Sequence, residues 1–522
     1  MGRAVPWFLL YSKVELPYLG TLPVFTMQHV PMFSAAAVLH ACPRLLPDAF
    51  TTDPKVLDAA ASLNAAHHLV GSDRNGLFDR LYDKLSNGDD CCIQIASLGG
   101  SNACGHGSAR HPWLRHQQSK LYGLHPAGVN RTYAALLVDW LSRGPTAACC
   151  RRGHEYINLC QGGAGTSYFV ETFEPSRLAK VDLLLVDVAP NDQNAFVLRF
   201  LKHKSNTPTL VSEAEKLTER FVRTLLKVEP QPPALLYVTT AWFVDELEGD
   251  LPEDQVHGAW PSQVPVLRHY GIPATHMPML LRRRARANDA NFSHHCWYID
   301  PPHYSLEAHT LQAWLLARSL AEVCARRRFK GAADAPAVPR GLPPPLFSGA
   351  ADEERVDLID FSDRTARFRS AILRDGFGWH WVEAVKKPGA GYQAVEVPAG
   401  ALPVAVRGKI GYTARHGDAT FEVLARFRTG QLHVMYMRSY SHMGAANVTI
   451  WHRPPPGHAT SSARLVSAKT LNGTWTLPYS LYTMDTIKLP RGSFRANASL
   501  LVRFSRLADA PGPFTVYTIA TY

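Results

Sequence analysis

Short apolar runs alternate with amphipathic, helix-length segments between residues 92 and 330, and this alternation most constrains the fold. Strands are predicted for CIQIASL (92–98), EYINLC (155–160), VDLLLVDV (181–188), ALLYVTT (234–240) and a short run near 272–276. Helical patterns separate them, one at 132–143 and one at 212–228, where Ser212 and Glu215 have capping-box spacing. Parallel strands joined by crossover helices produce such an alternation, so we expect an α/β domain over residues 90–330.

The alternation stops after a long helical stretch, and a segment rich in Pro, Gly and Ala follows at 331–350. This composition predicts a linker. Beyond it, β-rich runs such as QLHVMYMRSY and FTVYTIATY are separated by Gly, Pro and Asn turns, which predicts an all-β, jelly-roll-like sandwich over 351–522. Residues 1–89 are expected to form an N-terminal extension that packs on the α/β domain.

Composition excludes several classes of protein. The 522-residue chain is 46% hydrophobic, which is neither a disordered nor a fibrous composition. The net charge of +11 is spread over separate basic runs, so no nucleic-acid partner is expected. No stretch is long and apolar enough to predict an integral membrane span. The oligomeric state is left open.

Cysteines and glycosylation sequons indicate the secretory pathway. The nine cysteines include two adjacent pairs, Cys91/Cys92 and Cys149/Cys150, without the repeated Cys-x-x-Cys spacing of structural zinc. A few disulfides are therefore expected. Five Asn-x-Ser/Thr sequons occur, at Asn130, Asn291, Asn447, Asn472 and Asn497. We expect a secreted, cell-surface or Golgi-lumen protein, although VPWFLLY near the start is too short for an ordinary signal peptide.

Polar and glycine-rich turns follow three of the predicted strands. Gly99-Gly100-Ser101 follows the first strand directly, and a sharp turn there would expose a serine hydroxyl at the carboxyl end of the sheet, where ligands bind in open α/β folds. Gly162-Gly163 follows the second strand and Asn191 follows the third. Taken singly, each turn reads equally well as an ordinary strand ending.

A fourth motif, after these three turns, offers a candidate general base. Asp300 and His303 stand three residues apart before the long helical stretch, a spacing that lets a carboxylate reach one imidazole nitrogen while the other faces a serine. His309 is the alternative imidazole, and its helical spacing from His303 predicts a position along or behind the helix.

In chain order, Ser101, Gly163, Asn191 and the Asp300/His303 pair resemble the four blocks of the SGNH (GDSL-type) hydrolase superfamily, over residues 90–325. The resemblance implies a flavodoxin-like, three-layer α/β domain that needs no cofactor or metal. It implies Ser101 as nucleophile, His303 as base and Asp300 as its orienting carboxylate. The implied oxyanion hole consists of the Ser101 N–H, the Gly163 N–H, with Gly162 as the alternative, and the Asn191 amide.

Two positions depart from the family pattern. Gly100 stands where the family has Asp, and Ala189 followed by Pro190 stands where it has Gly. Neither change removes a proton-transfer group or an oxyanion donor, so both are interpreted as variants. The Gly-Gly-Ser form resembles the carbohydrate-esterase-like branches of the superfamily.

The resulting hypothesis is a serine esterase that removes O-acyl groups, foremost acetyl groups, from a polysaccharide or glycan. Two alternatives stay open: a carbohydrate O-acyltransferase with the same triad, and a non-catalytic glycan-binding or cell-surface interaction protein. Three further features carry less weight. His294, His295 and Cys296 lack a partner pair for a metal site, His106 lines the crevice or a helix surface, and the pair Trp379/Trp381 either stacks on sugar or packs in a core.

Overall fold

The structure is a computed structural model that describes most of the chain from residue 76 onward. The described residues are 76–86, 91–105, 132–143, 149–192, 207–240, 260–277, 298–300, 303–304, 306–329, 342–347, 357–360, 372–374, 379–387, 391–396, 409–414, 419–438, 443–452, 463–474, 481–510 and 512–522.

Five parallel strands form a sheet with the order β2-β1-β3-β4-β5. Their bounds are β1 Gln94–Gly99, β2 Glu155–Asn158, β3 Leu183–Asp187, β4 Ala234–Thr239 and β5 Ala274–His276. Strands β3 and β4 are buried along their whole length, because helices cover both faces of the sheet. This strand order is that of flavodoxin-like folds, and the predicted α/β architecture is confirmed.

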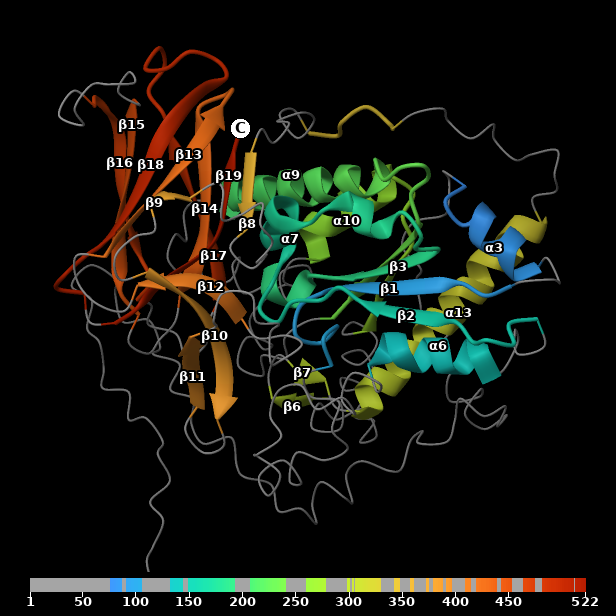
Figure 1. The fold of residues 1–522 in the computed structure, drawn as a ribbon. Coiled ribbons are helices and arrows are strands. Elements are labelled where there is room, and N and C mark those ends of the chain that lie inside the picture. Colours follow the sequence, from blue (N-terminus) through green and yellow to red (C-terminus); the bar gives the residue numbers. More distant parts are fainter. Residues whose placement is uncertain are drawn as a thin grey trace, which may run out of the picture.

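Alternate side chains of each strand face two different helical layers. Leu184 and Val186 pack with α7, α9 and α10, whereas Leu183 and Leu185 pack with α3, α6 and α13. The helix bounds are α3 Asp79–Ser86, α6 Tyr133–Arg143, α7 Thr166–Thr172, α9 Thr207–Leu226, α10 Trp260–His269 and α13 Leu306–Phe329, with a 3₁₀ turn at Pro175–Leu178. Figure 1 shows α9 and α10 above the sheet and α6 below it. Among the helices described, none is long and apolar enough to cross a membrane.

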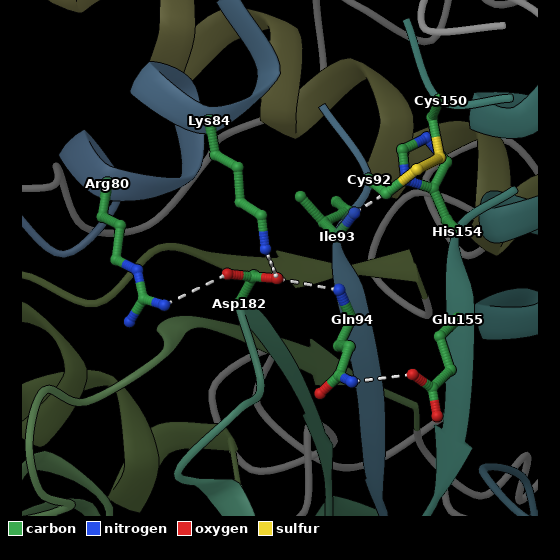
Figure 2. A network of polar contacts seen from close by, with 9 residues as sticks. All are labelled: Arg80, Lys84, Cys92, Ile93, Gln94, Cys150, His154, Glu155 and Asp182. Carbon is green, nitrogen blue, oxygen red and sulfur yellow. Dashed lines mark hydrogen bonds and ion pairs between the residues drawn. A yellow bond between two sulfur atoms is a disulfide. The ribbon is translucent and has the colours of Figure 1, made fainter. Parts of the chain in front are cut away.

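A polar network ties helix α3 to the amino-terminal edge of the sheet (Figure 2). The buried carboxylate of Asp182 accepts hydrogen bonds from Lys84 Nζ at 2.7 Å and from the Gln94 backbone N–H at 2.8 Å. The guanidinium of Arg80 lies 3.6 Å from the same carboxylate. Residues 76–86 therefore pack on the α/β domain, with Phe78 and Leu81 in its core.

Two adjacent disulfides lie at the same edge. They are Cys91–Cys149 and Cys92–Cys150, and they join the segments that lead into β1 and β2. Beside them, His154 Nδ1 accepts a hydrogen bond from the Ile93 N–H at 3.1 Å. Burial, followed by the charge of Lys84, lowers the pKa of His154, so the ring is neutral and able to accept this bond. The expectation of disulfides is met, and they hold β1 and β2 together at their start.

The C-terminal part is a sandwich of two antiparallel sheets, as predicted. One sheet has the order β11-β10-β12-β19-β14-β17, with β8 also paired to β19, and the other has the order β16-β15-β18-β13-β9. The first sheet contains β8 Asp357–Asp360, β10 Trp379–Lys387, β11 Gly391–Glu396, β12 Lys409–Ala414, β14 Gln431–Arg438, β17 Leu481–Lys488 and β19 Phe514–Thr521. The second contains β9 Ile372–Arg374, β13 Thr420–Phe427, β15 Ala445–His452, β16 Leu465–Asn472 and β18 Ala498–Arg506.

The sandwich packs directly on the α/β part, and β14 and β19 are buried on both faces. In β14, Val434 and Tyr436 face the sandwich core, whereas Met435 and Met437 join the core that also contains Phe169 of α7. Figure 1 shows β14, β17 and β19 beside α7, with β15 and β16 on the far side. The two parts therefore share one hydrophobic core, in addition to the separate core of each.

The described part of the predicted linker is held against the helices. The N–H groups of Leu346 and Phe347 donate to the carboxylate of Glu219 in α9 at 2.5 and 2.9 Å. Arg223 donates to the carbonyl of Pro343 at 2.8 Å. One local expectation was wrong: α9 begins at Thr207, so Ser212 lies inside the helix and does not cap it.

Candidate active site

Ser101 lies in a tight turn directly after β1, at the carboxyl-terminal edge of the parallel sheet, and is half-buried. The Gly100 N–H donates to the Asp187 carbonyl at 2.9 Å, and the Cys104 N–H donates to the Gly100 carbonyl at 3.0 Å. A Cβ atom on Gly99 would lie 2.1 Å from the Asp187 carbonyl oxygen. Only glycine fits at position 99, because the turn presses its backbone against the end of β3.

The glycine loop after β2 lies beside this turn. The Gln161 N–H donates to the Gly99 carbonyl at 2.8 Å, and the Ala164 N–H closes a turn onto the Gln161 carbonyl at 3.0 Å. Gly163 has φ +82°, a left-handed conformation that favours glycine. A third disulfide, Cys104–Cys160, links the two segments covalently. The backbone of the glycine loop is therefore fixed against the serine turn.

The side chain of Asn191 lies between these two segments. Its Nδ2 donates to the Ala164 carbonyl at 2.8 Å. A Cβ atom on Gly100 would lie only 1.9 Å from the same Nδ2, so the amide occupies the space beside the serine turn. A carboxamide NH₂ has two hydrogens, and the bond to Ala164 uses one of them. No described residue accepts a hydrogen bond from the second hydrogen.

Asp192, the next residue, holds the start of α7. Its carboxylate accepts from the Thr166 N–H at 2.7 Å, from Thr166 Oγ1 at 2.5 Å and from Gln263 Nε2 at 3.2 Å. Loss of hydration raises the pKa of Asp192 to about 7, and the Thr166 and Gln263 hydrogen bonds limit the rise. Through its hydrogen bonds to Thr166, Asp192 orders the end of the glycine loop.

His303 belongs to a small hairpin that is tied to the serine turn by Asn102. The hairpin consists of β6 (Tyr298–Asp300) and β7 (His303–Tyr304), in which Asp300 and His303 are backbone register partners. The buried side chain of Asn102 accepts from the Tyr304 N–H at 3.0 Å through Oδ1, and its Nδ2 donates to Thr240 Oγ1 at 3.3 Å. Asn102, which follows Ser101, is therefore hydrogen-bonded to Tyr304, which follows His303.

Asp187, the last residue of β3, contacts the serine turn through its carbonyl, which accepts from the Gly100 N–H, and was missed by sequence reasoning. Its fully buried carboxylate accepts from Thr240 Oγ1 at 2.7 Å and from the Tyr133 hydroxyl at 3.0 Å. Burial raises the pKa of Asp187 to about 7, and the hydrogen bonds from Thr240 and Tyr133 limit the rise. A single carboxylate at the end of an otherwise apolar strand was the available sequence signal.

The other sequence candidates have different surroundings. His309 is fully buried in α13, where its ring stacks on Tyr133 at 5.7 Å between centroids and its Nδ1 accepts from the Tyr133 N–H at 3.3 Å. Trp379 is buried and stacks on Tyr412, so it packs in the sandwich core. His106, His294, His295, Cys296, Asn130, Asn291 and the Trp381 side chain lie outside the described residues.

The three C-terminal sequons occupy the outer side of the sandwich. Asn472 and Asn497 are exposed, and Asn447 is half-buried, with its Oδ1 accepting from the hydroxyl of Thr470 at 2.7 Å. Asn447 and Asn472 lie on neighbouring strands of the sheet that is remote from α7. No sequon asparagine among the described residues is packed in a core, and all five stay predicted glycosylation sites.

Comparisons with known proteins identify the fold. No protein-family model matches the chain, and no curated protein matches its sequence. The solved structure of a two-domain esterase (CEX) active on acetylated mannans superposes with a TM-score of 0.57 at 16% sequence identity, covering 87% of this chain and 96% of that chain. The same esterase co-crystallised with mannopentaose gives a TM-score of 0.56 at the same identity and coverage. The chain therefore has the fold of that two-domain esterase.

Proposed function

We propose that this protein is an SGNH-type serine esterase that removes O-acyl groups, foremost acetyl groups, from a polysaccharide or glycan. One observation carries the proposal: the Asn191 amide lies against Gly100 while its other contact is the Ala164 carbonyl, so the serine turn, the glycine loop and Asn191 meet. Donors gathered around a nucleophile are what acyl transfer requires. The hydrogen bond between Tyr304 and Asn102 also attaches the hairpin that carries His303, the proposed base, to the serine turn.

In acylation, Ser101 Oγ attacks the ester carbonyl carbon while His303 takes the hydroxyl proton. Asp300 keeps the imidazole in the required tautomer and stabilises the imidazolium. The carbonyl electron pair moves onto oxygen, where the Ser101 N–H, the Gly163 N–H and the Asn191 amide bind it. The C–O bond to the sugar then breaks, and His303 returns the proton to the departing sugar hydroxyl.

In deacylation, His303 takes a proton from water and the resulting hydroxide attacks the acyl-serine carbonyl. The same donors bind the second oxyanion, which collapses to release acetate and to restore the Ser101 hydroxyl. If a sugar hydroxyl replaced water, the same residues would transfer the acyl group, so substrate access alone separates an esterase from an acyltransferase.

A carbohydrate substrate and a secretory location are parts of the same proposal. The carbohydrate substrate is supported by the two-domain esterase of the same fold, which is active on acetylated mannans. The secretory location is supported by three disulfides, because such bonds persist in oxidising compartments, and by exposed sequons on the sandwich.

The test combines active-site labelling with acetate release by the full chain. We expect a fluorophosphonate probe to label Ser101, and acetylated mannan or another acetylated polysaccharide to lose acetate. Ser101→Ala should abolish both, and His303→Ala should abolish acetate release without unfolding the protein. Ser493→Ala, which alters a serine in a remote turn of the sandwich, is the matched control and should change neither.

Other outcomes favour the alternatives. Acetyl transfer to an added oligosaccharide in excess of acetate release would identify an acyltransferase. A folded chain that binds polysaccharide but leaves Ser101 unlabelled would contradict serine-esterase chemistry and favour a glycan-binding protein.

A further inference from the structure

Gln161 connects the serine turn to the glycine loop through its backbone. Its N–H donates to the Gly99 carbonyl at 2.8 Å, two residues before Ser101, and its carbonyl accepts from the Ala164 N–H at 3.0 Å. The peptide units around Gly162 and Gly163 lie between these two anchors. Any movement of Gln161 would therefore change the direction of the N–H groups in this loop.

The side chain of Gln161 extends to the sandwich. Its Nε2 donates to the hydroxyl of Tyr482 in β17 at 2.8 Å, across 321 positions of sequence. The glycine loop is thus held by contacts from two sides: Asn191 and the Cys104–Cys160 disulfide within the α/β part, and Tyr482 from the sandwich.

Tyr482 is itself fixed in place. Its side chain is 9% exposed, and its ring packs against Tyr168 of α7 at 5.0 Å and edge-on against Tyr517 of β19 at 4.6 Å. Its backbone pairs with Met437 in β14. A hydroxyl on so constrained a ring can orient a hydrogen-bond partner, because little rotational freedom is left to lose.

We propose that Tyr482 is a positioning residue for the oxyanion hole, so that the sandwich takes part in catalysis by holding the glycine loop through Gln161. This inference rests on the proposed esterase function. Tyr482 touches neither the nucleophile nor the reacting ester in this scheme, and it acts on the direction of the Gly163 N–H.

The expected kinetic signature is a loss in kcat with little change in KM. Tyr482→Phe keeps the ring and removes the hydroxyl, and an oxyanion donor acts on charge that develops in the transition state. Removing one neutral hydrogen bond that acts in the transition state should lower kcat about threefold to tenfold. Gln161→Met should give a similar loss, and the double variant should lose no more than either single variant, because both remove the same bond.

The matched control is Tyr517→Phe. It removes a hydroxyl from a buried ring that packs on Tyr482, in the same interface, without touching the Gln161 bond. We expect this variant to retain kcat. Thermal unfolding of each variant shows whether a change in kcat follows stability, and an equal fall in kcat for Tyr482→Phe and Tyr517→Phe would overturn the inference.

Hydrogen exchange provides a readout that does not depend on activity. The amides of residues 162–164 should exchange faster in Tyr482→Phe than in the wild type or in Tyr517→Phe, and unchanged exchange overturns the inference. If the wild-type chain fails to release acetate, the proposed function falls while exchange still decides the role of Tyr482. If the wild type is active and Tyr482→Phe keeps its kcat, the inference falls and the esterase function stands.

Discussion

At the serine turn, Gly99 and Gly100 lie too close to neighbouring atoms for any Cβ. The Asp187 carbonyl fills the space beside Gly99, and the Asn191 amide fills the space beside Gly100. The SGNH pattern has an aspartate at the second position, and here that side chain would collide with Asn191 held by Ala164. Gly100 therefore leaves the space beside the serine turn to the Asn191 amide.

The first prediction concerns Asn191→Ala, which removes this amide. We expect kcat for ester hydrolysis to fall by about 10² to 10³, the usual effect of losing one oxyanion donor, with KM almost unchanged. The Ala164 carbonyl also loses its partner, so circular dichroism and thermal unfolding must accompany the kinetics. An unchanged kcat in the folded variant would remove Asn191 from the mechanism.

The second prediction uses the raised pKa of Asp187, about 7 in the folded chain against 3.8 as the ordinary value. A folded carboxyl with a raised pKa contributes stability that is fully present below pH 3.8 and is lost as the pH rises through 7. Asp187→Asn cannot ionise and escapes this loss. Relative to wild type, its free energy of unfolding should rise by on the order of 4 kcal/mol between pH 4 and 7 and then level off.

Denaturant unfolding at a series of pH values checks this. Asp509→Asn, which neutralises an exposed carboxylate in a turn of the sandwich, is the control and should give a profile parallel to wild type. A difference between Asp187→Asn and wild type that stays constant from pH 4 to 7 would show that the carboxyl titrates at its ordinary pKa.

At the scale of elements, the parallel sheet was predictable because its signal is local. Runs such as VDLLLVDV are mostly apolar, which indicates strands buried on both faces. Amphipathic helices lie between these runs, and a parallel sheet covered by helices on both sides buries the strands and the apolar helix faces together. The sandwich was predictable in kind for the same reason: β13 and β18 alternate buried and exposed residues. Both parts of the fold are confirmed.

Other elements depend on tertiary contacts that no local pattern carries. Strands β14 and β19 bury both faces because the α/β part covers the outer one. The start of α9 at Thr207 lies upstream of the stronger cap signal at Ser212. Within the candidate site, the glycine turns could be predicted one by one. The contacts that bring them together, between Asn102 and Tyr304 and between Gln161 and Tyr482, join residues 202 and 321 positions apart, which no local pattern shows.

The third prediction concerns helix α3 and its ion pair at the amino-terminal edge. Lys84→Met keeps most of the aliphatic length of the side chain but leaves the buried Asp182 carboxylate without its nearest cation. We expect a loss of about 1 to 3 kcal/mol in the free energy of unfolding, because a buried charge loses a hydrogen-bond donor. The value of kcat should stay unchanged, since the network lies at Gln94, where β1 begins, whereas Ser101 follows the other end of this strand.

Arg143→Met is the matched control for this prediction. It breaks the Arg143–Asp139 ion pair, which at 2.8 Å is nearly as short as the 2.7 Å Lys84–Asp182 pair. The side chains of Arg143 and Asp139 are 80% and 49% exposed, whereas the Asp182 side chain is 1% exposed. An exposed helix pair of this type contributes under about 0.5 kcal/mol. Equal losses for Lys84→Met and Arg143→Met in denaturant unfolding would show that burial of Asp182 adds nothing.

At the scale of the whole molecule, the α/β part and the sandwich share a core, and one buried carboxylate lies in their interface. Glu171 of α7 accepts from His433 Nδ1 at 3.0 Å and from the Tyr522 hydroxyl at 2.5 Å, and the Arg220 guanidinium lies over the Tyr522 ring. Burial opposes ionisation, but these partners outweigh it and hold the pKa of Glu171 below its usual 4.5. Because the two parts share a hydrophobic core and the buried contacts of Glu171 with His433 and Tyr522, we expect them to unfold in one transition.

The last prediction is that Glu171→Gln weakens this interface at neutral pH and not in acid. A folded carboxyl with a lowered pKa contributes stability that is present above pH 4.5 and is lost as the pH falls through its folded pKa. At pH 7 the variant should lose on the order of 2 kcal/mol, because an amide keeps the volume of the side chain but not its charge. As the pH falls from 4.5 through the lower folded pKa, the folded wild type takes up a proton and loses the same charge, so the difference should shrink over that range. Calorimetry at pH 7 and at a series of pH values descending from 4.5 measures both effects. Glu422→Gln, which breaks the ion pair with Arg503 in the sheet remote from α7, is the control that leaves the interface intact. A variant that matches wild type at pH 7, or a deficit that persists unchanged in acid, would show that the charge of Glu171 does not hold the two parts together.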